Sequence, residues 1–322
     1  MKALVTGANG FTGSHLVKAL VKRGVAVIAY VRRSSQCDRL ANLPITYAYG
    51  DITDQAALTA AMTDVDTVFH TAAYVELGLV DETAMERVNV QGTQAVLAAA
   101  QANRVSKMVH CSTIGIFGDT QGKVVDETFV RTQTTFSSAY DRTKYLAQQA
   151  VDAAAHQGFD VVSVLPSGIF GADDPHFGPV VQTFLKGRLK LWAGGDRITG
   201  IVHVDDLVEA MILAAERGRM GEHYIISAGE MTTREMFRQF SQQSGIPAPA
   251  EAPEVIVRLL GNLLDPIGRL LRWQPPLSRE RVHYVYDRCV RVSGEKARSQ
   301  LGWTPRSAEE TLRELMPAYE NA

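Results

Sequence analysis

Short apolar runs alternate with longer amphipathic stretches over the first half of the chain. Six runs have the length and residue types of buried strands: Ala3–Thr6, Ala26–Val31, Thr46–Tyr49, Thr67–Thr71, Lys107–Ser112 and Val161–Leu165. Stretches with helical spacing of apolar residues lie between them, at Gly13–Arg23, Gln55–Met62, Thr83–Ala102 and Ala139–His156. This alternation predicts an α/β fold built around a doubly wound parallel sheet.

The pattern changes after Pro166. Clusters of Gly, Pro and Asp become frequent there, as at Gly171–Pro175, Gly194–Asp196 and Pro247–Pro249. We therefore expect residues 1–165 to form the core. Residues 166–322 are expected to form mainly a smaller, irregular region, with some segments returning to the core. Ligands of open α/β sheets bind at the carboxyl ends of the strands, so this region is expected to bind a substrate against that edge.

One stretch of the second region, Val255–Leu271, has its apolar residues on one helical face, at positions 256, 259, 260, 263, 264, 267, 270 and 271. We favour a helix that packs into the core. A flexible apolar lid or a membrane-surface contact is the alternative, because Arg258, Arg269 and Arg272 follow the polar side. Together with Asp265 these charges interrupt the stretch, and no segment approaches the about 20 apolar residues that cross a bilayer. No integral membrane segment is expected.

The composition narrows the class of protein. The chain has 322 residues, 46% of them hydrophobic, and a formal net charge of −2. Without a basic excess, nucleic acid is not an expected partner. Cys37, Cys111 and Cys289 are odd in number and far apart, which argues against a metal or redox centre and favours a reducing compartment. Because a strand and a glycine turn begin within Met1–Gly7, no leader is expected, and we predict a cytoplasmic protein.

A glycine-rich turn follows the first predicted strand. Gly7, Gly10 and Gly13 are spaced three apart and precede an amphipathic helix. Glycines at this spacing permit a tight turn, close approach of the backbone to a pyrophosphate, and close packing of helix on strand, while the helix N-terminus presents free N–H groups. The strand–turn–helix context is the one that this motif requires. We therefore expect the turn to bind a dinucleotide.

The residues at the end of the second predicted strand indicate which dinucleotide is bound. Folds that prefer NAD usually place an acidic residue there for the ribose 2′-hydroxyl, whereas this chain has Val31, Arg32 and Arg33. A guanidinium can pair with a 2′-phosphate, so NADP(H) is the preferred cofactor, with NAD(H) as the alternative. Two solvated surface arginines would leave the same pattern. Asp51 and Ile52 are placed to flank an adenine ring, although Asp51 could equally cap a helix.

Tyr140 and Lys144 stand four residues apart, which puts them on one face of a helix. An ammonium beside a phenol lowers its pKa from about 10, so the pair could serve acid–base chemistry near neutral pH. Such a pair is common by chance. It gains weight from Ser112 and Thr113, whose hydroxyls follow a predicted strand, at the sheet edge where a nicotinamide would lie.

Taken together, these motifs resemble those of an extended short-chain dehydrogenase/reductase, of the NAD-dependent epimerase/dehydratase type, over nearly the whole chain. The matching stretches are Gly7–Gly13, Gly50–Asp54, His70–Ala73, Val88–Thr93, Cys111–Gly118, the pair Tyr140 and Lys144, Pro166–Gly171 and Val202–Asp206. The family implies a Rossmann-type sheet with residues 1–165 as its dinucleotide-binding part. It also implies that Thr113 hydrogen-bonds the substrate oxygen, Tyr140 transfers the proton and Lys144 supports it. Ser112 is the adjacent alternative to Thr113.

The turn and the resemblance together give the residues that we expect at the cofactor. They are Gly7, Asn9, Gly10, Phe11, Thr12, Gly13, Arg32, Asp51, Ile52, Thr71, Ala72, Ala73, Tyr140, Lys144, Pro166, Gly168 and Ile169. By resemblance, Asn89 braces strand–helix packing near the active site, although a purely structural asparagine is equally consistent. His70 and His203 are interpreted as structural or cofactor-lining, since no partner ligands stand at metal-binding spacing. No metal site is expected.

Four positions distinguish the branches of this family. Nucleotide-sugar epimerases and dehydratases usually carry an asparagine and a phosphate-binding arginine where this chain has Gly168 and Thr199. Dehydratases carry an Asp-Glu pair where it has Ile114 and Gly115. With those two groups set aside, the chain resembles the dihydroflavonol reductase, cinnamoyl-CoA reductase and 3β-hydroxysteroid dehydrogenase branch of the family. We therefore expect an NADP(H)-dependent oxidoreductase that interconverts a carbonyl and an alcohol on a small, largely apolar substrate.

Two other functions stay open. A nucleotide-sugar 4-epimerase with tightly bound NAD would need other cations for the diphosphate, and Arg197 or Arg279 could supply them. A non-catalytic dinucleotide sensor would be expected to lack the Tyr140 and Lys144 pair, which is intact here. A homodimer is compatible with the sequence, which does not set the oligomeric state.

Overall fold

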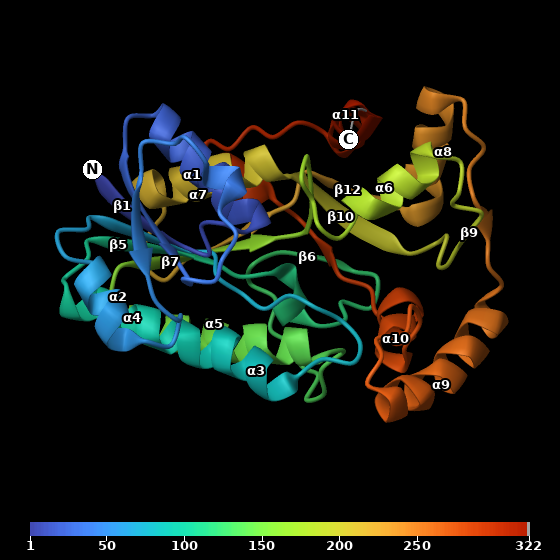
Figure 1. The fold of residues 1–322 in the computed structure, drawn as a ribbon, viewed down its shortest axis with the longest axis horizontal. Coiled ribbons are helices and arrows are strands. Elements are labelled where there is room, and N and C mark those ends of the chain that lie inside the picture. Colours follow the sequence, from blue (N-terminus) through green and yellow to red (C-terminus); the bar gives the residue numbers. More distant parts are fainter. Residues whose placement is uncertain (321–322) are drawn as a thin grey trace.

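A seven-stranded parallel sheet forms the centre of the computed structural model, which describes residues 1–320 (Figure 1). Its strand order is β11-β7-β5-β4-β1-β2-β3, and every neighbouring pair is parallel. The strands are β1 (Lys2–Thr6), β2 (Ala26–Val31), β3 (Thr46–Tyr49), β4 (Thr67–His70), β5 (Lys107–Cys111), β7 (Val161–Pro166) and β11 (His223–Ile226). The predicted α/β fold with a doubly wound parallel sheet is confirmed.

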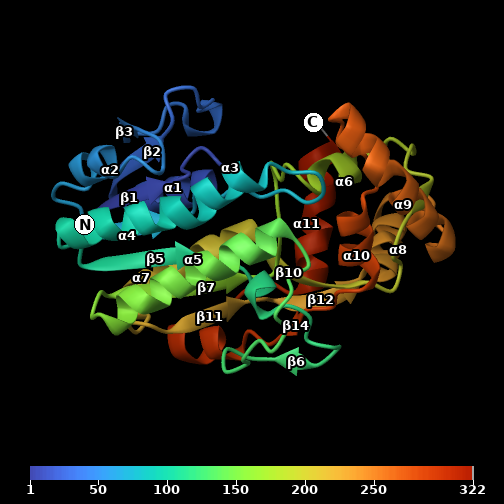
Figure 2. The ribbon, with the colours of Figure 1, turned by 90° about the horizontal axis from the view of Figure 1, so that it is seen from below.

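Helices cover both faces of this sheet (Figures 1 and 2). On one face α1 (Phe11–Lys22) packs beside α7 (Val204–Arg217). On the other lie α2 (Gln55–Ala61), α4 (Gly92–Ala102) and α5 (Ala139–His156). Each layer has its own buried apolar cluster, because strands covered on both sides are apolar on both sides.

The strand order reverses beside β1. From β1 the chain winds outward through β2 to β3, then returns to β4 on the other side of β1 and continues outward to β11. In an open α/β sheet the crevice at this reversal, outside the carboxyl ends of the strands, is where ligands bind. The glycine turn leaves the sheet at this point.

The observed elements differ from the predicted ones at several element ends, in one added strand and in one helix. Thr71 and Ser112 lie just beyond the ends of their strands, and β11 joins the sheet from the second half of the chain, where no strand was predicted. The predicted helix Thr83–Ala102 is a continuous run of α3 (Glu82–Glu86), a π-helical turn (Arg87–Gln91) and α4. Periodicity cannot reveal this extra residue per turn, because it depends on what Asn89 contacts.

A smaller set of elements lies beyond the carboxyl ends of the central strands. A three-stranded sheet pairs β10 (Ile198–His203) with β8 (Gly168–Phe170) and β12 (Gly229–Thr232). The helices α6 (Gly178–Leu185), α8 (Thr233–Ser244) and α11 (Ala308–Glu320) pack around buried phenylalanines beside it. The remaining elements are β6 (Val124–Val125) with β14 (Arg291–Val292), β9 (Leu191–Trp192) with β13 (Ala250–Glu251), α9 (Glu254–Leu271), α10 (Arg279–Tyr286), 3₁₀ turns at Asp38–Leu40 and Ile114–Phe117, and a π-helical turn at Ala297–Leu301. The last two residues of the predicted region 166–322 lie outside the described part.

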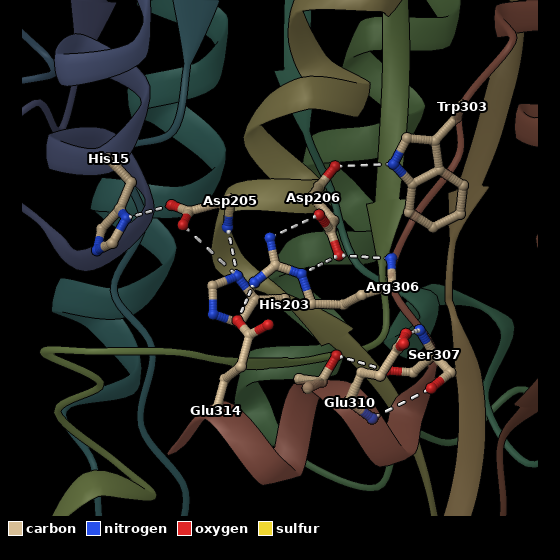
Figure 3. A network of polar contacts seen from close by, with 10 residues as sticks. His15, His203, Asp205, Asp206, Trp303, Arg306, Ser307, Glu310 and Glu314 are labelled. Carbon is tan, nitrogen blue, oxygen red and sulfur yellow. Dashed lines mark hydrogen bonds and ion pairs between the residues drawn. The ribbon is translucent and has the colours of Figure 1, made fainter. Parts of the chain in front are cut away.

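A polar network joins the C-terminal segment to the central sheet (Figure 3). His203 accepts a hydrogen bond from the Asp205 amide (3.1 Å) and so caps α7. The Trp303 indole donates to the Asp206 carbonyl (2.8 Å), and Arg306 pairs with the Asp206 carboxylate (3.0 Å). His203 therefore has a structural role, and the Val202–Asp206 motif fixes the junction between the two parts of the chain.

Helix α9 does not pack its apolar side into the core, so the interpretation that we favoured for Val255–Leu271 is wrong. Its buried residues are Val257, Gly261, Asp265 and Gly268, while the large apolar side chains are exposed. Glycines allow close approach on the buried side, and this turns the leucines outward. Within residues 1–320, no helix is both long and apolar enough to cross a membrane.

Candidate active site

The glycine turn brings three backbone segments together at the carboxyl end of β1. Gly7 has a φ of +66°, and a Cβ there would lie 2.8 Å from the Ala72 backbone. A Cβ at Gly13 would overlap the Gly7 carbonyl. Gly10 precedes α1 with no side-chain cap within the described structure. The first N–H groups of α1 are therefore free to face an anion at the turn.

A cavity of about 480 Å³ opens at this turn, a volume typical of cofactor sites. Of the predicted cofactor residues, it is lined by Gly7, Asn9, Gly10, Arg32, Asp51, Ile52, Thr71, Ala72 and Ala73. Its other lining residues are Tyr30, Val31, Ser35, Gly50, Tyr74, Val75 and Val88. Residues from the ends of four strands thus meet in one cavity, as parallel strands require.

The remaining predicted cofactor residues do not line this cavity. Phe11, Thr12 and Gly13 form the first turn of α1. Pro166 ends β7, while Gly168 and Ile169 lie in β8, an edge strand of the three-stranded sheet. Lys144 and Tyr140 stand on α5, deeper along the same sheet edge. For these residues the cofactor role stays a prediction.

Asp51 is held in the cavity wall by its own hydrogen bonds. Its carboxylate accepts from the Thr53 hydroxyl (2.7 Å) and amide (3.0 Å) and pairs with Arg87 (2.6 Å). These contacts, chiefly the Thr53 hydroxyl, lower the pKa of Asp51 to about 2. The cap of α2 is Asp54, whose side chain accepts from the Ala57 amide. The alternative of Asp51 as a helix cap is therefore wrong.

The three predicted catalytic residues come from two neighbouring elements. Thr113 directly follows β5, where its hydroxyl accepts from the Gly115 amide (3.1 Å). Tyr140 lies in the first turn of α5, a helix capped by the Ser138 hydroxyl. The Thr113 side chain lies near enough to the Tyr140 phenol to act on its pKa. The buried Ser112 hydroxyl has no partner within the described structure, so the geometry favours Thr113 as the hydroxyl beside the tyrosine.

The electrostatics of Tyr140 differ from the expectation. Burial raises the pKa of Tyr140 above the ordinary value, and Cys111 and Asp141 add smaller contributions in the same direction. The Thr113 side chain lowers this pKa and only partly offsets the rise. Lys144 donates instead to the Cys111 carbonyl (2.8 Å), and burial lowers the pKa of its own ammonium to about 8. Lys144 therefore does not depress the tyrosine pKa in this structure. The phenol is protonated at neutral pH.

Buried polar groups brace the helix that carries the tyrosine. Asn89, in the π-helical turn, accepts from the Tyr74 amide (2.7 Å) and donates to the Thr143 hydroxyl (3.0 Å). His70 bridges the Thr6 and Thr93 hydroxyls (2.8 and 2.9 Å). Burial lowers the pKa of His70 to about 3, so it is a neutral structural residue. Among residues 1–320 no cluster of side chains is suited to hold a metal ion.

Residues from the C-terminal half complete the surroundings of the tyrosine, and sequence reasoning missed most of them. Arg288 pairs with Asp141 (3.2 Å), and their side chains are 7% and 1% exposed. The guanidinium groups of Arg288 and Arg197 each lie over the Tyr284 ring, 4.5 Å and 4.6 Å from its centroid. The only signal was Arg197, which precedes Thr199 by two positions and so shares its side of the extended chain. Tyr284 and Arg288 belong to no local motif.

Comparison with known proteins agrees with this geometry. The model of the NAD-dependent epimerase/dehydratase family matches residues 3–227. The chain is 33% identical to a 4-hydroxy-2-methyl-3-oxo-4-farnesyl-3,4-dihydroquinoline-1-oxide ketoreductase from Stigmatella aurantiaca, over 100% of this chain and 98% of the relative. It is 30% identical to a 3-beta-hydroxysteroid dehydrogenase from Mycolicibacterium neoaurum, over 99% and 91%. A UDP-glucose 4-epimerase from Thermotoga maritima, solved with UDP-glucose, shares the fold with a TM-score of 0.81 at 24% identity, over 100% of this chain and 99% of that one. This chain therefore belongs to the NAD-dependent epimerase/dehydratase family, within the extended short-chain dehydrogenases/reductases.

Proposed function

We propose that this chain is an NADP(H)-dependent oxidoreductase that interconverts a carbonyl and an alcohol on a small, largely apolar substrate. The observation that carries the proposal is that Thr113, at the end of β5, lies beside Tyr140, in the first turn of α5, at the sheet edge that also holds the dinucleotide cavity. The family binds NAD(P). Residues 1–165 would be the dinucleotide-binding part, and residues 166–322 mainly the substrate-binding part.

The cavity fits a dinucleotide in shape and charge. Gly7 and Gly13 leave the room that a pyrophosphate needs, since a Cβ at either would meet backbone atoms. Arg32 lines the cavity at the end of β2, where a guanidinium can pair with a 2′-phosphate. The glycine turn suits either dinucleotide, and Arg32 supports NADP(H) over NAD(H).

Residues of this chain would carry out the proton transfer. When bound, the nicotinamide supplies or takes a hydride. Thr113 would hold the substrate oxygen, and the protonated phenol of Tyr140 would donate to that oxygen as charge develops on it. A tyrosine with a raised pKa is in the correct state for carbonyl reduction at neutral pH. Lys144, on the same face of α5, would keep a positive charge beside the site.

The substrate is expected to be largely apolar for a steric and an electrostatic reason. A Cβ at Gly168 would lie 2.8 Å from the Gly200 carbonyl, so the asparagine usual in sugar-nucleotide enzymes does not fit there. Thr199 supplies no charge for a diphosphate, whose desolvation would then go uncompensated. The relatives named above reduce or oxidise a farnesylated quinoline oxide or a steroid, by their names, and both molecules are largely apolar.

One observation favours a second candidate, the nucleotide-sugar 4-epimerase. Arg197 and Arg288 both lie over the Tyr284 ring, and Arg288 is paired with Asp141, whereas Arg197 has no ion pair within residues 1–320. Two guanidinium groups beside one carboxylate could accept an anionic substrate group.

A paired titration separates the two candidates. The NADP-bound protein is titrated with UDP-glucose and with an aromatic ketone, and NADPH oxidation is followed with aldehydes, ketones, flavanonols and sterols. We expect turnover with one of the apolar carbonyls and no saturable binding of UDP-glucose. Micromolar binding of UDP-glucose without any carbonyl turnover would contradict the reductase function and favour the epimerase function.

A further inference from the structure

Helix α9 exposes an apolar face along its whole length. The side chains of this face include Leu259, Leu263 and Leu270, which are 64%, 60% and 83% exposed. The face continues past the helix end to Trp273, which is 47% exposed. A contiguous exposed apolar patch of this kind is often a site of interaction.

The rotation of α9 is fixed by what its other side contacts. A Cβ at Gly261 would meet Val282 of α10, and one at Gly268 would lie 2.7 Å from the Trp273 carbonyl. Asp265 is buried, accepts from the Arg279 amide (3.2 Å) and pairs with Arg269 (2.9 Å). Turning the leucines inward would break these contacts. The outward apolar face is therefore a property of the folded state.

We propose that this face of α9 lies flat on an anionic lipid membrane surface. The helix forms an outer edge of the molecule in both ribbon views, with nothing of this chain in front of it (Figures 1 and 2). An amphipathic helix with leucines and a tryptophan on one side and arginines beside them binds the interface between headgroups and acyl chains. It does not need the length of a spanning segment.

The charges next to the face suit anionic headgroups. Arg258 is shared by two carboxylates, Glu254 of the first turn and Asp287, and Asp265 is paired with Arg269. Arg272 and Arg279 are exposed at the end that carries Trp273. The end of the apolar face that carries Trp273 therefore has a basic excess, with Arg269, Arg272 and Arg279 against Asp265 and Glu280. Each unpaired arginine there adds to the attraction of an anionic leaflet.

A second copy of this chain fits the face less well. A helix of 18 residues presents a strip of about 27 Å by about 10 Å, on the order of 300 Å². A stable protein interface buries about 800 Å² on each partner. The strip is large enough to sink into a lipid interface and too small to hold a dimer alone.

The location of α9 connects this surface to the active site, and this step rests on the proposed function. Gln274, just beyond α9, accepts from the Leu79 amide (2.8 Å), and Glu280 of α10 accepts from the Gly78 amide (2.8 Å). Gly78 and Leu79 belong to the segment that begins at Tyr74, in the wall of the dinucleotide cavity. Helix α10 also carries Tyr284. An apolar substrate dissolved in the bilayer would thus meet the protein at the element that adjoins its site.

The test is flotation of the purified protein with two kinds of vesicle, one of phosphatidylcholine alone and one of phosphatidylcholine and phosphatidylglycerol in equal parts. We expect the wild type to float with the anionic vesicles. The triple variant Leu259→Glu, Leu263→Glu, Leu270→Glu should lose at least about tenfold in binding, because three apolar contacts are removed. Met220→Glu, at a 51%-exposed position in the turn after α7, is the matched control and should bind as the wild type does. Arg272→Asn with Arg279→Gln should weaken binding to the anionic vesicles by about fivefold for each arginine.

The readouts keep the possible outcomes apart. The leucines are exposed, so the triple variant should keep the wild-type melting temperature and circular dichroism. A wild type that stays in the supernatant, or a triple variant that floats equally well, would overturn the membrane proposal. So would a wild-type dimer that becomes monomeric in the triple variant without vesicle binding, since a second copy would then cover the face. Flotation needs no turnover, so a protein that floats but reduces no carbonyl would overturn only the proposed function.

Discussion

Replacing Lys144 with methionine is expected to stabilise the protein while removing most of its activity. Lys144 is 3% exposed, and burial lowers its pKa from 10.5 to about 8. At about 1.4 kcal/mol per pKa unit, burying this charge costs about 3 kcal/mol at pH 7. Methionine avoids that cost and gives up one hydrogen bond to the Cys111 carbonyl, worth about 1 kcal/mol. The net gain of about 2 kcal/mol corresponds to a rise in Tm of about 3 °C for a chain of this length.

The stability gain from Lys144→Met depends on pH with a definite sign. The folded state releases the Lys144 proton above about pH 8, whereas the unfolded chain keeps it to about pH 10.4. Between these values the unfolded state binds more protons, so the wild type gains stability as the pH rises. The advantage of the variant should therefore vanish by about pH 10, where the folded amine is already neutral.

Urea unfolding of the cofactor-free protein, followed by circular dichroism at pH 7 and pH 10, measures this difference. The exposed Lys18→Met on α1 is the matched control and should change stability by less than about 0.5 kcal/mol at either pH. Carbonyl reduction is assayed on the same preparations. A Lys144→Met protein that is less stable than the wild type at pH 7, or equally favoured at both pH values, would refute the reasoning.

Three further predictions concern the proton, the cofactor and acid stability. Tyr140→Phe should fold and bind cofactor but lose about 10²–10⁴ in kcat; NADPH oxidation at near wild-type rate would remove Tyr140 from the mechanism. Arg32→Ala should weaken NADPH binding about tenfold or more and leave NADH binding unchanged, because a charged hydrogen bond contributes about 1.5–3 kcal/mol; equal calorimetric affinities of the wild type for both cofactors would contradict this. His70→Gln should lessen the acid sensitivity of the fold. Because burial holds the pKa of His70 at about 3, the unfolded state binds its proton first as the pH falls, and the wild type should lose about 2 kcal/mol more than the variant between pH 7 and pH 5. Urea unfolding at the two pH values that gives parallel losses would show that His70 does not titrate in this way.

The sequence by itself determined the sheet and the turn at its edge. Buried parallel strands are apolar on both faces, and their helices keep a 3.6-residue period, so β1 to β5, β7 and α5 could be located from local pattern alone. The glycines of the turn were equally readable, because Gly7 and Gly13 stand where any side chain would meet backbone. Tyr140 and Lys144 were paired by helical spacing, which tertiary structure does not alter.

Only the tertiary structure decided the features that depend on distant segments. The strand β11 lies in the second half of the chain, outside the alternation of apolar runs and helical stretches, and it is a strand because it pairs with the edge of β7. Arg288 and Tyr284 reach Tyr140 from almost 150 residues downstream along the chain. The pKa of Tyr140 rises because the fold buries it, and Lys144 donates to a backbone carbonyl. The amphipathic pattern of α9 predicted a helix with one apolar face. Which way that face points was set by the glycines and the buried Asp265 on its other side, because a pattern gives the period of a helix and only its neighbours fix its rotation.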